Sequence, residues 1–133
     1  MINNIEEDYC SFEIAKLLKE KKFDVNTLFY YWESGDIGNG YVGKLGSYDG
    51  CYNLAKFDYP KDNICAMPTH ALAIKWILEN FGIHIWVDYD NKLKHYCGNY
   101  MTINKSDNNW INKNSFEEAT EAALLFTLQN LIC

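Results

Sequence analysis

The stretch PTHALAIKWILENFG, residues 68–82, runs directly into IHIWVDYD, residues 83–90, and these two segments decide the fold class. Proline is tolerated in the first turn of a helix, threonine can cap one, and Gly82 supplies a stop signal, so the first segment predicts a helix. In the second segment isoleucine and valine alternate with polar or aromatic residues, which is typical of a strand with one buried face. The centre of the chain therefore mixes helix and strand.

Two further helices are predicted, one on each side of this centre. Ser11 is a good N-cap for a short amphipathic helix that ends near Lys22. The SFEE sequence at residues 115–118 is a capping box that places carboxylates at the positive end of the helix dipole. The last helix is therefore expected to run from Phe116 to about Leu131.

The remaining segments are predicted to supply the rest of a sheet. Residues 27–33 contain four aromatic residues in a row, which fit a half-buried pleated surface. Further strands are expected at residues 41–45, 51–58 and 93–103. The fold class expected for residues 1–133 is a single α+β domain, with an antiparallel sheet of about four to five strands and helices packed mainly on one face.

The expected core lies between the central helix and the strand that follows it. Apolar side chains recur on one side of each element, and burial of such faces is what stabilises a domain. The side chains expected there, together with the apolar face of the last helix, are Ile74, Leu78, Phe81, Ile83, Ile85 and Val87.

The last helix carries an unbroken apolar run from Ala122 to Phe126. A helix that is apolar on all sides must be covered on more than one side, either by its own domain or by a second copy of the chain. Deep burial and a homodimer through this helix are both open, and the homodimer is the hypothesis to be tested.

Composition and charge exclude several classes of protein. The 133 residues are 48% hydrophobic and carry 12 lysines, no arginine and 18 acidic residues, for a net charge of −6. Nonspecific nucleic-acid binding, which needs clustered basic residues, is not expected. The acidic N-terminus does not resemble a secretory signal, and no apolar stretch reaches the ~18 residues of a membrane span. Five cysteines without a C-x-x-C pair indicate a reducing compartment, so the expected location is cytoplasmic.

The glycine-rich segment matches two phosphate-binding motifs only in part. Residues 38–43 satisfy G-x-G-x-x-G, and residues 38–44 satisfy the first part of a phosphate loop, but Leu45 stands where that loop needs a hydroxyl. Both motifs require a helix whose N-terminus faces the phosphates, and residues 44–50 are too rich in glycine to form one. No nucleotide cofactor is therefore predicted.

Histidine and cysteine show no catalytic or metal-binding pattern. The three histidines and five cysteines lack the spacing of a structural zinc site, and nothing marks any cysteine as an activated nucleophile. We therefore expect no catalytic residue and no metal ligand, and the chain is predicted not to be an enzyme.

Aromatic and glycine residues supply the candidate binding site instead. Six glycines fall within residues 34–50, which makes this segment a poor helix or strand and frees backbone amides for an anion. If helices cover one face of the sheet, the aromatic residues on the other face are available to a partner. The predicted ligand- or partner-binding residues are Tyr30, Trp32, Gly40, Tyr41, Lys44, Tyr48 and Trp86.

Three segments carry a resemblance: AMPTHALAIKWIL at residues 66–78, GIHI at residues 82–85 and SFEEATEAAL at residues 115–124. They resemble a loose family of small uncharacterised proteins from Bacteroidetes and their phages. The resemblance implies no activity, but it favours a phage or mobile-element accessory protein.

Two functional hypotheses follow. In the first, the chain is a non-enzymatic factor that binds and inhibits a host protein, such as a component of host defence. In the second, it sequesters a small anionic ligand such as a nucleotide, in a pocket built from the glycine-rich segment and the aromatic residues.

Overall fold

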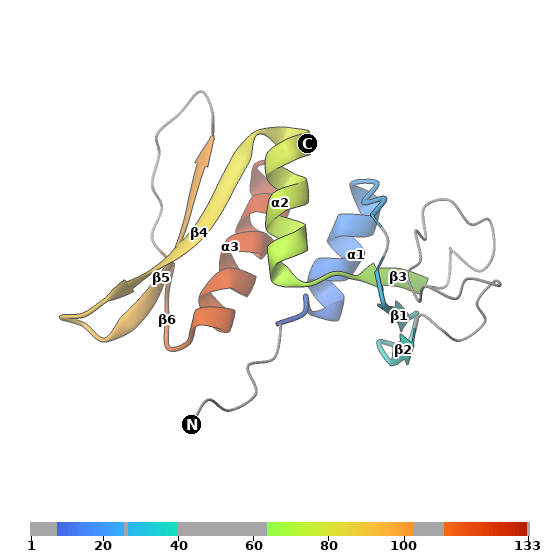
Figure 1. The fold of residues 1–133 in the computed structure, drawn as a ribbon, viewed down its shortest axis with the longest axis horizontal. Helices are drawn as coiled ribbons and strands as arrows, with labels where there is room; N and C mark the ends of the chain where they lie inside the picture. Colours follow the sequence, from blue (N-terminus) through green and yellow to red (C-terminus); the bar gives the residue numbers. More distant parts are fainter. Residues whose placement is uncertain (1–7, 26, 40–63, 103–110, 133) are drawn as a thin grey trace. The chain divides into compact units, whose positions relative to one another are not determined.

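A computed structural model of the chain describes residues 8–25, 27–39, 64–102 and 111–132 (Figure 1). The helices and strands follow one another as α1 (Phe12–Glu20), β1 (Phe29–Trp32), β2 (Ile37–Asn39), β3 (Ile64–Met67), α2 (His70–Phe81), β4 (Ile83–Asp90), β5 (His95–Thr102), β6 (Ile111–Lys113) and α3 (Phe116–Asn130). The predicted α+β class is confirmed. The described strands form two antiparallel sheets of three strands each, so each sheet is smaller than the four to five strands expected.

The described residues fall into two compact units. The first unit contains residues 8–9, 69–102 and 111–123, and the second contains residues 10–25, 27–39, 64–68 and 124–132. Helix α3 contributes its first half to the first unit and its second half to the second.

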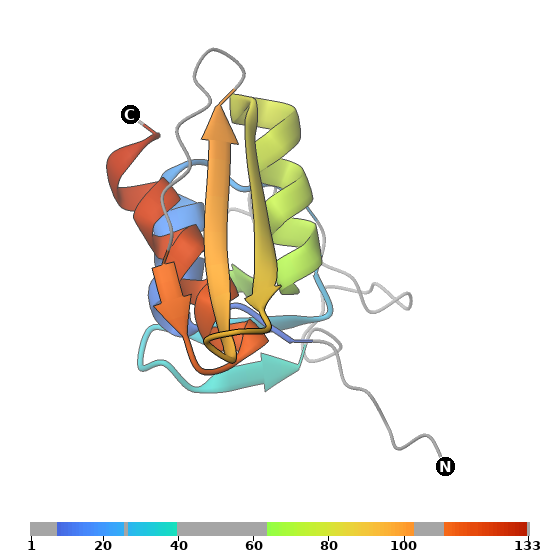
Figure 2. The same cartoon turned by 90° about the vertical axis from the view of Figure 1, so that its left-hand side faces the viewer.

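In the first unit, helices lie on one face of the sheet with strand order β4–β5–β6 (Figure 2). Helix α2 packs against β4, and α3 passes so close to β5 that a Cβ added at Gly98 would lie 2.7 Å from the carbonyl oxygen of Ala119. Ala123 would lie 3.2 Å from the same added atom. Glycine at this position therefore permits the close contact between helix and sheet.

The capping residues predicted for all three helices are confirmed. The hydroxyl of Thr69 accepts a hydrogen bond from the Leu72 amide, and Gly82 ends α2 in the left-handed conformation with φ 69°. The hydroxyls of Ser11 and Ser115 likewise accept bonds from amides three residues later. These local signals fix where the helices begin.

The predicted core is confirmed on β4 and wrong on α2. Ile83 and Ile85 are buried, and Val87 is half-buried. On α2, however, Leu78 and Phe81 are about two-fifths exposed and Ile74 is only half-buried. The buried side of α2 carries His70, Ala73, Trp76 and Ile77. Burying Trp76 removes more apolar area from water than burying Ile74, which favours this rotation of the helix.

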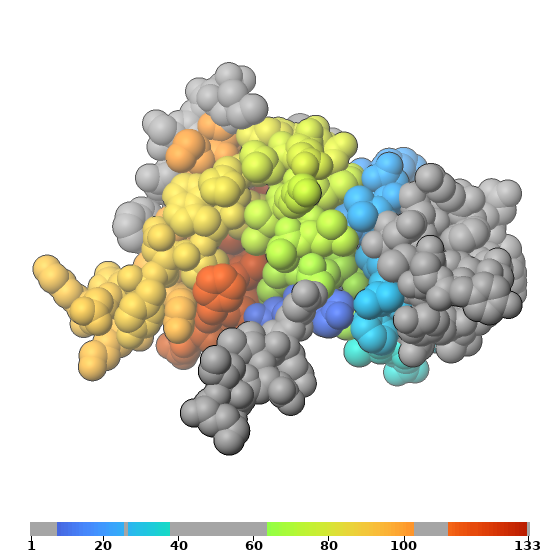
Figure 3. All heavy atoms as spheres, viewed as in Figure 1, coloured from blue at the N-terminus to red at the C-terminus, as the bar shows by residue number. Residues whose placement is uncertain are grey.

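The far end of the β4–β5 hairpin extends beyond the helices of its unit (Figures 1 and 3). A turn follows Asp90, with Lys94 at φ 54°. Leu93 in this turn is 67% exposed and Tyr89 is 51% exposed. The ring of Tyr89 packs against that of Tyr96 with centroids 4.9 Å apart. Tyr96 also packs edge to face against Phe116 at the start of α3, with centroids 6.2 Å apart, so among the described residues the helix cover of this side ends at Tyr96.

In the second unit, β1 is the central strand of the sheet β2–β1–β3. A tight turn joins β1 to β2, with the amide of Trp32 donating to Asp36 and Gly35 at φ 92°. Strand β3 was not predicted, because its four residues are all buried and show no alternation. The returning strand expected at residues 51–58 and the strand expected at residues 41–45 lie outside the described residues.

Helix α1 packs on β3 and buries Ile14, Ala15 and Leu18. In the described part of the chain, no helix has both the length and the apolar character needed to cross a membrane.

Candidate binding sites

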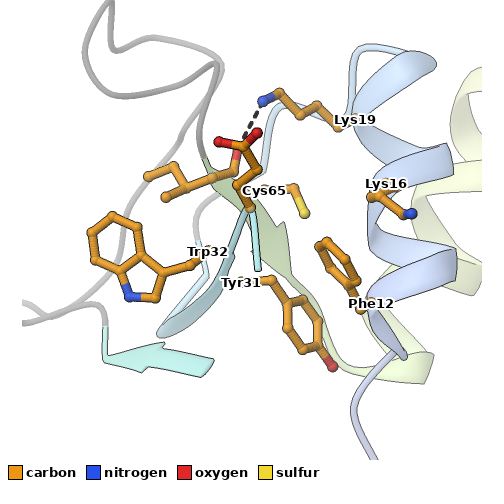
Figure 4. Close-up of a pocket in the computed structure, with 8 residues that line it drawn as sticks. Phe12, Lys16, Lys19, Tyr31, Trp32 and Cys65 are labelled. Atoms are coloured by element: carbon orange, nitrogen blue, oxygen red, sulfur yellow. Dashed lines mark hydrogen bonds between the residues drawn. The ribbon is translucent and has the colours of Figure 1, made fainter. Parts of the chain in front are cut away.

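An open hollow lies in the second unit between α1 and the strands β1 and β3 (Figure 4). We call it the Trp32 hollow, and its volume is about 100 Å³. Its walls are mostly aromatic and aliphatic, and three charged side chains complete the lining. The residues that line it are Phe12, Lys16, Lys19, Tyr31, Trp32, Glu33, Ile64 and Cys65.

The aromatic side chains of the Trp32 hollow are held by defined contacts. The hydroxyl of Tyr31 donates a buried hydrogen bond of 2.6 Å to the carbonyl oxygen of Cys10. The ring of Phe12 packs against that of Tyr31 with centroids 5.4 Å apart. Trp32 is 40% exposed, so its indole is the most exposed aromatic ring of the wall.

The charged residues of the Trp32 hollow come mainly from α1. The ammonium group of Lys16 lies 4.7 Å from the centroid of Phe12. Lys19 donates a 2.8 Å hydrogen bond to the carbonyl oxygen of Ile64. With Glu33 as the third charged residue, two positive charges face one negative charge.

Cys65 lies in this hollow, but its chemistry does not suit a nucleophile. Burial raises the pKa of the Cys65 thiol to about 11, although the positive charges of Lys19 and Lys16 act to lower it. A thiol with that pKa is protonated at neutral pH, whereas nucleophilic attack needs the thiolate.

Tyr30 and Trp32, which were expected to share a face of the strand, do pack together. Their rings form an edge-to-face pair with centroids 5.3 Å apart. Tyr30 is only 6% exposed, and burial raises the pKa of its hydroxyl. It therefore supports Trp32 and does not present a surface of its own. The other predicted residues from this part of the chain, Gly40, Tyr41, Lys44 and Tyr48, lie outside the described residues.

Trp86, the remaining predicted residue, lies in the first unit on the face of sheet β4–β5–β6 opposite the helices. We call this face the open face. Residues paired directly across antiparallel strands share a face, which assigns the members of the open face. On β4 they are His84, Trp86, Asp88 and Asp90, and on β5 and β6 they are His95, Cys97, Asn99, Met101 and Asn112.

Hydrogen bonds link the polar side chains of the open face into a network. Oδ2 of Asp88 accepts from Nε1 of Trp86 at 3.1 Å and from the amide nitrogen of Asn99 at 3.3 Å. Asn99 also donates to the carbonyl oxygen of Cys97, whose thiol donates to Asn112. Asn99 is 2% exposed, so this network is anchored in a buried amide.

The thiol of Cys97 is a poor metal ligand at neutral pH. Burial raises its pKa, and the negative charges of Asp90 and Asp88 raise it further. A metal-bound cysteine is deprotonated, so these surroundings oppose metal binding at this thiol.

His70 is buried at the start of α2 and pairs with α3. Its Nε2 lies 2.7 Å from a carboxylate oxygen of Glu121, and its Nδ1 has no hydrogen-bond partner among the described residues. Within the first unit this pair joins two helices on the same face of the sheet, which suits a packing role.

Sequence reasoning missed most residues around Trp32 and Trp86. Lys16, Lys19 and Phe12 were assigned to an amphipathic helix, and nothing local indicates that β3 lies beside them. Asp88 could have been found, because a two-residue period places it on the same side of its strand as Trp86, whereas Asn99 needs the pairing of β4 with β5.

No protein-family model, no curated protein and no solved structure matches the chain. The resemblance to small Bacteroidetes and phage proteins therefore stays a hypothesis.

Proposed function

We propose that this chain is a non-enzymatic factor that binds a partner protein, and that the Trp32 hollow receives one apolar side chain of that partner. The observation that carries the proposal is the size and lining of the hollow, an open and largely apolar site of about 100 Å³. Pockets for drug-sized ligands typically enclose about 300–1,000 Å³, and an apolar cavity of about 150 Å³ accepts benzene. The hollow therefore suits a single side chain better than a nucleotide.

The charges around the hollow indicate what flanks the inserted side chain. Lys16 and Lys19 outnumber Glu33, so a partner segment with acidic residues next to its apolar anchor is favoured. Tryptophan is enriched among the residues that dominate binding energy at protein interfaces, and Trp32 is the exposed aromatic residue of the site.

Two further points support a binding role over catalysis and define its form. The thiol of the hollow is protonated at neutral pH, because the pKa of Cys65 is raised to about 11. The resemblance to phage and Bacteroidetes proteins favours inhibition of a host protein, such as a defence component in the cytoplasm.

A peptide selection tests this proposal. A phage-displayed library of random peptides would be selected against the full chain, and we expect enriched peptides to carry an apolar residue beside acidic ones. Trp32→Ala should weaken their binding by about tenfold or more, as truncation of an interface anchor typically does. Lys16→Glu, which reverses an exposed charge, should also weaken it.

The control is Tyr89→Ala, which removes another exposed aromatic ring from the first unit and should leave peptide binding unchanged. Circular dichroism would confirm that each variant is folded. If no peptide is enriched, or if enriched peptides bind both hollow variants as tightly as the wild-type chain, the proposal is wrong.

A further inference from the structure

We propose that the open face binds the guanidinium group of an arginine side chain on a partner polypeptide, at a site formed by His84, Trp86 and Asp88. These three side chains follow one another on one side of β4. They belong to the first unit, whereas the Trp32 hollow belongs to the second. The proposal therefore depends on different residues from those of the proposed function, and either one can fail without the other.

The aromatic part of the site is a stack of two rings. The imidazole of His84 and the indole of Trp86 are nearly parallel, with an interplanar angle of 19° and centroids 5.2 Å apart. The imidazole packs on one face of the indole. A guanidinium group is planar and stacks on aromatic rings, and tryptophan is the best partner for such a cation. The indole face turned away from His84 is the surface for this stacking.

The acidic part of the site is a carboxylate held at the edge of the indole. Oδ2 of Asp88 accepts hydrogen bonds from Nε1 of Trp86 at 3.1 Å and from the buried amide of Asn99 at 3.3 Å. Oδ1 of Asp88 accepts no hydrogen bond from any described residue. A guanidinium lying on the ring can donate to this oxygen, and hydrogen bonds between charged groups are the strong ones.

The charge around the site favours a cation. Asp88 and Asp90 are the carboxylates of the open face, and the described residues of that face include no lysine. The backbone amides of Leu93 and Lys92 donate to Asp90 and lower the pKa of its carboxyl, so it stays ionised at neutral pH. The remaining titratable groups of the face are His84, His95 and Cys97.

An arginine within a polypeptide suits the face better than free arginine does. Free arginine is a zwitterion at its α-carbon, so the aspartates attract its α-ammonium while they repel its α-carboxylate, and it brings no neighbouring side chain. In a polypeptide an apolar neighbour of the arginine can also contact Met101, which is paired with His84 and is 39% exposed.

Nuclear magnetic resonance of the full chain tests the site. The probe is the capped peptide acetyl-Gly-Arg-Leu-amide, with acetyl-Gly-Lys-Leu-amide and free arginine as comparison ligands. We expect the indole N–H signal of Trp86, identified as the signal lost in Trp86→Phe, to shift with saturation on adding the arginine peptide. Asp88→Asn should weaken this binding by about tenfold, the loss expected for one charge-assisted hydrogen bond.

The matched control is Asp36→Asn, which removes one carboxylate charge from an exposed turn in the second unit and should leave the affinity within twofold. If both aspartate variants weakened peptide binding equally, the loss would come from net charge alone, and the proposed site would be wrong. Absence of a shift at Trp86, or equally tight binding of the lysine peptide or of free arginine, would overturn it as well.

Discussion

At the scale of single residues, Cys65 shows burial and charge acting in opposite directions on one thiol. Cys65 is 4% exposed, and this burial disfavours the thiolate, while the charges of Lys19 and Lys16 favour it. Burial is the larger effect, because the pKa is raised from its ordinary value of 9.0 to about 11. The folded chain therefore holds this proton more tightly than the unfolded chain does.

This shift predicts how Cys65 reacts with iodoacetamide. At pH 8 about a tenth of an ordinary thiol with pKa 9.0 is ionised, against about a thousandth at pKa 11, so labelling of the folded chain should be about 100-fold slower. Because the pKa is raised, the contribution of this group to stability is complete below pH 9 and is lost as the pH rises to about 11.

Mass spectrometry of the peptide that contains Cys65 measures the rate, with the urea-unfolded chain as control. The labelling rate of the folded chain should keep rising to about pH 11. A folded-state midpoint near pH 9 would contradict the assigned burial of this thiol.

At the scale of secondary-structure elements, the contact between β5 and α3 depends on Gly98. A methyl group at this position would lie 2.7 Å from the backbone oxygen of Ala119, and a backbone atom in a packed helix cannot move aside cheaply. Overpacking of this kind typically costs about 1–3 kcal/mol. Gly98→Ala should therefore lower the free energy of unfolding by that amount in urea denaturation.

Met101→Ala is the control on the same strand. Met101 lies on the open face and is 39% exposed, so its truncation should cost less than Gly98→Ala. An equal loss in both variants would show that the strand tolerates no change at all, and an unchanged stability in Gly98→Ala would mean that α3 can move away from the sheet.

The elements differ in how well the sequence predicts them, for a physical reason. Helix caps at Ser11, Thr69 and Ser115 act within three residues, so the sequence reveals all three. Strand β3 is buried at every position and β6 has only three residues, so neither shows the two-residue period on which strand prediction depends. The side of α2 that is buried depends on long-range packing of Trp76, which no local pattern contains.

The same distinction holds for the candidate sites. Trp86 was predicted from alternation along one strand, and the open face confirms that its side chain lies opposite the helix-covered side. The Trp32 hollow is lined by residues of both α1 and β3. Lys19 of α1 and Ile64 of β3 are 45 residues apart in the sequence. Such a site cannot be predicted until the strand order is known.

At the scale of the whole molecule, the number of copies of the chain in its assembly can be measured directly. In α3, Ala123, Leu124 and Leu128 are buried, while Ala122, Leu125 and Phe126 are half-buried. The half-buried apolar residues leave part of α3 for a second copy of the chain to cover, so we predict a homodimer. Native mass spectrometry of the chain purified from cells should show the mass of a dimer and no retained nucleotide.

Sedimentation at several concentrations is the control for association in the gas phase. A concentration-independent monomer would remove the homodimer, and a retained small molecule would favour ligand sequestration over partner binding.

The division of α3 between the two units also has a consequence for synthesis on the ribosome. The second unit, whose described residues before α2 are 10–25, 27–39 and 64–68, takes further buried side chains, among them Leu124 and Leu128, from a segment that follows the whole of residues 69–123. At roughly 5–20 residues per second, those intervening residues take about 3 to 11 seconds to translate. During this time the nascent second unit is incomplete while the first is being made. Until α3 has been made, the earlier segment therefore lacks the side chains that complete its packing.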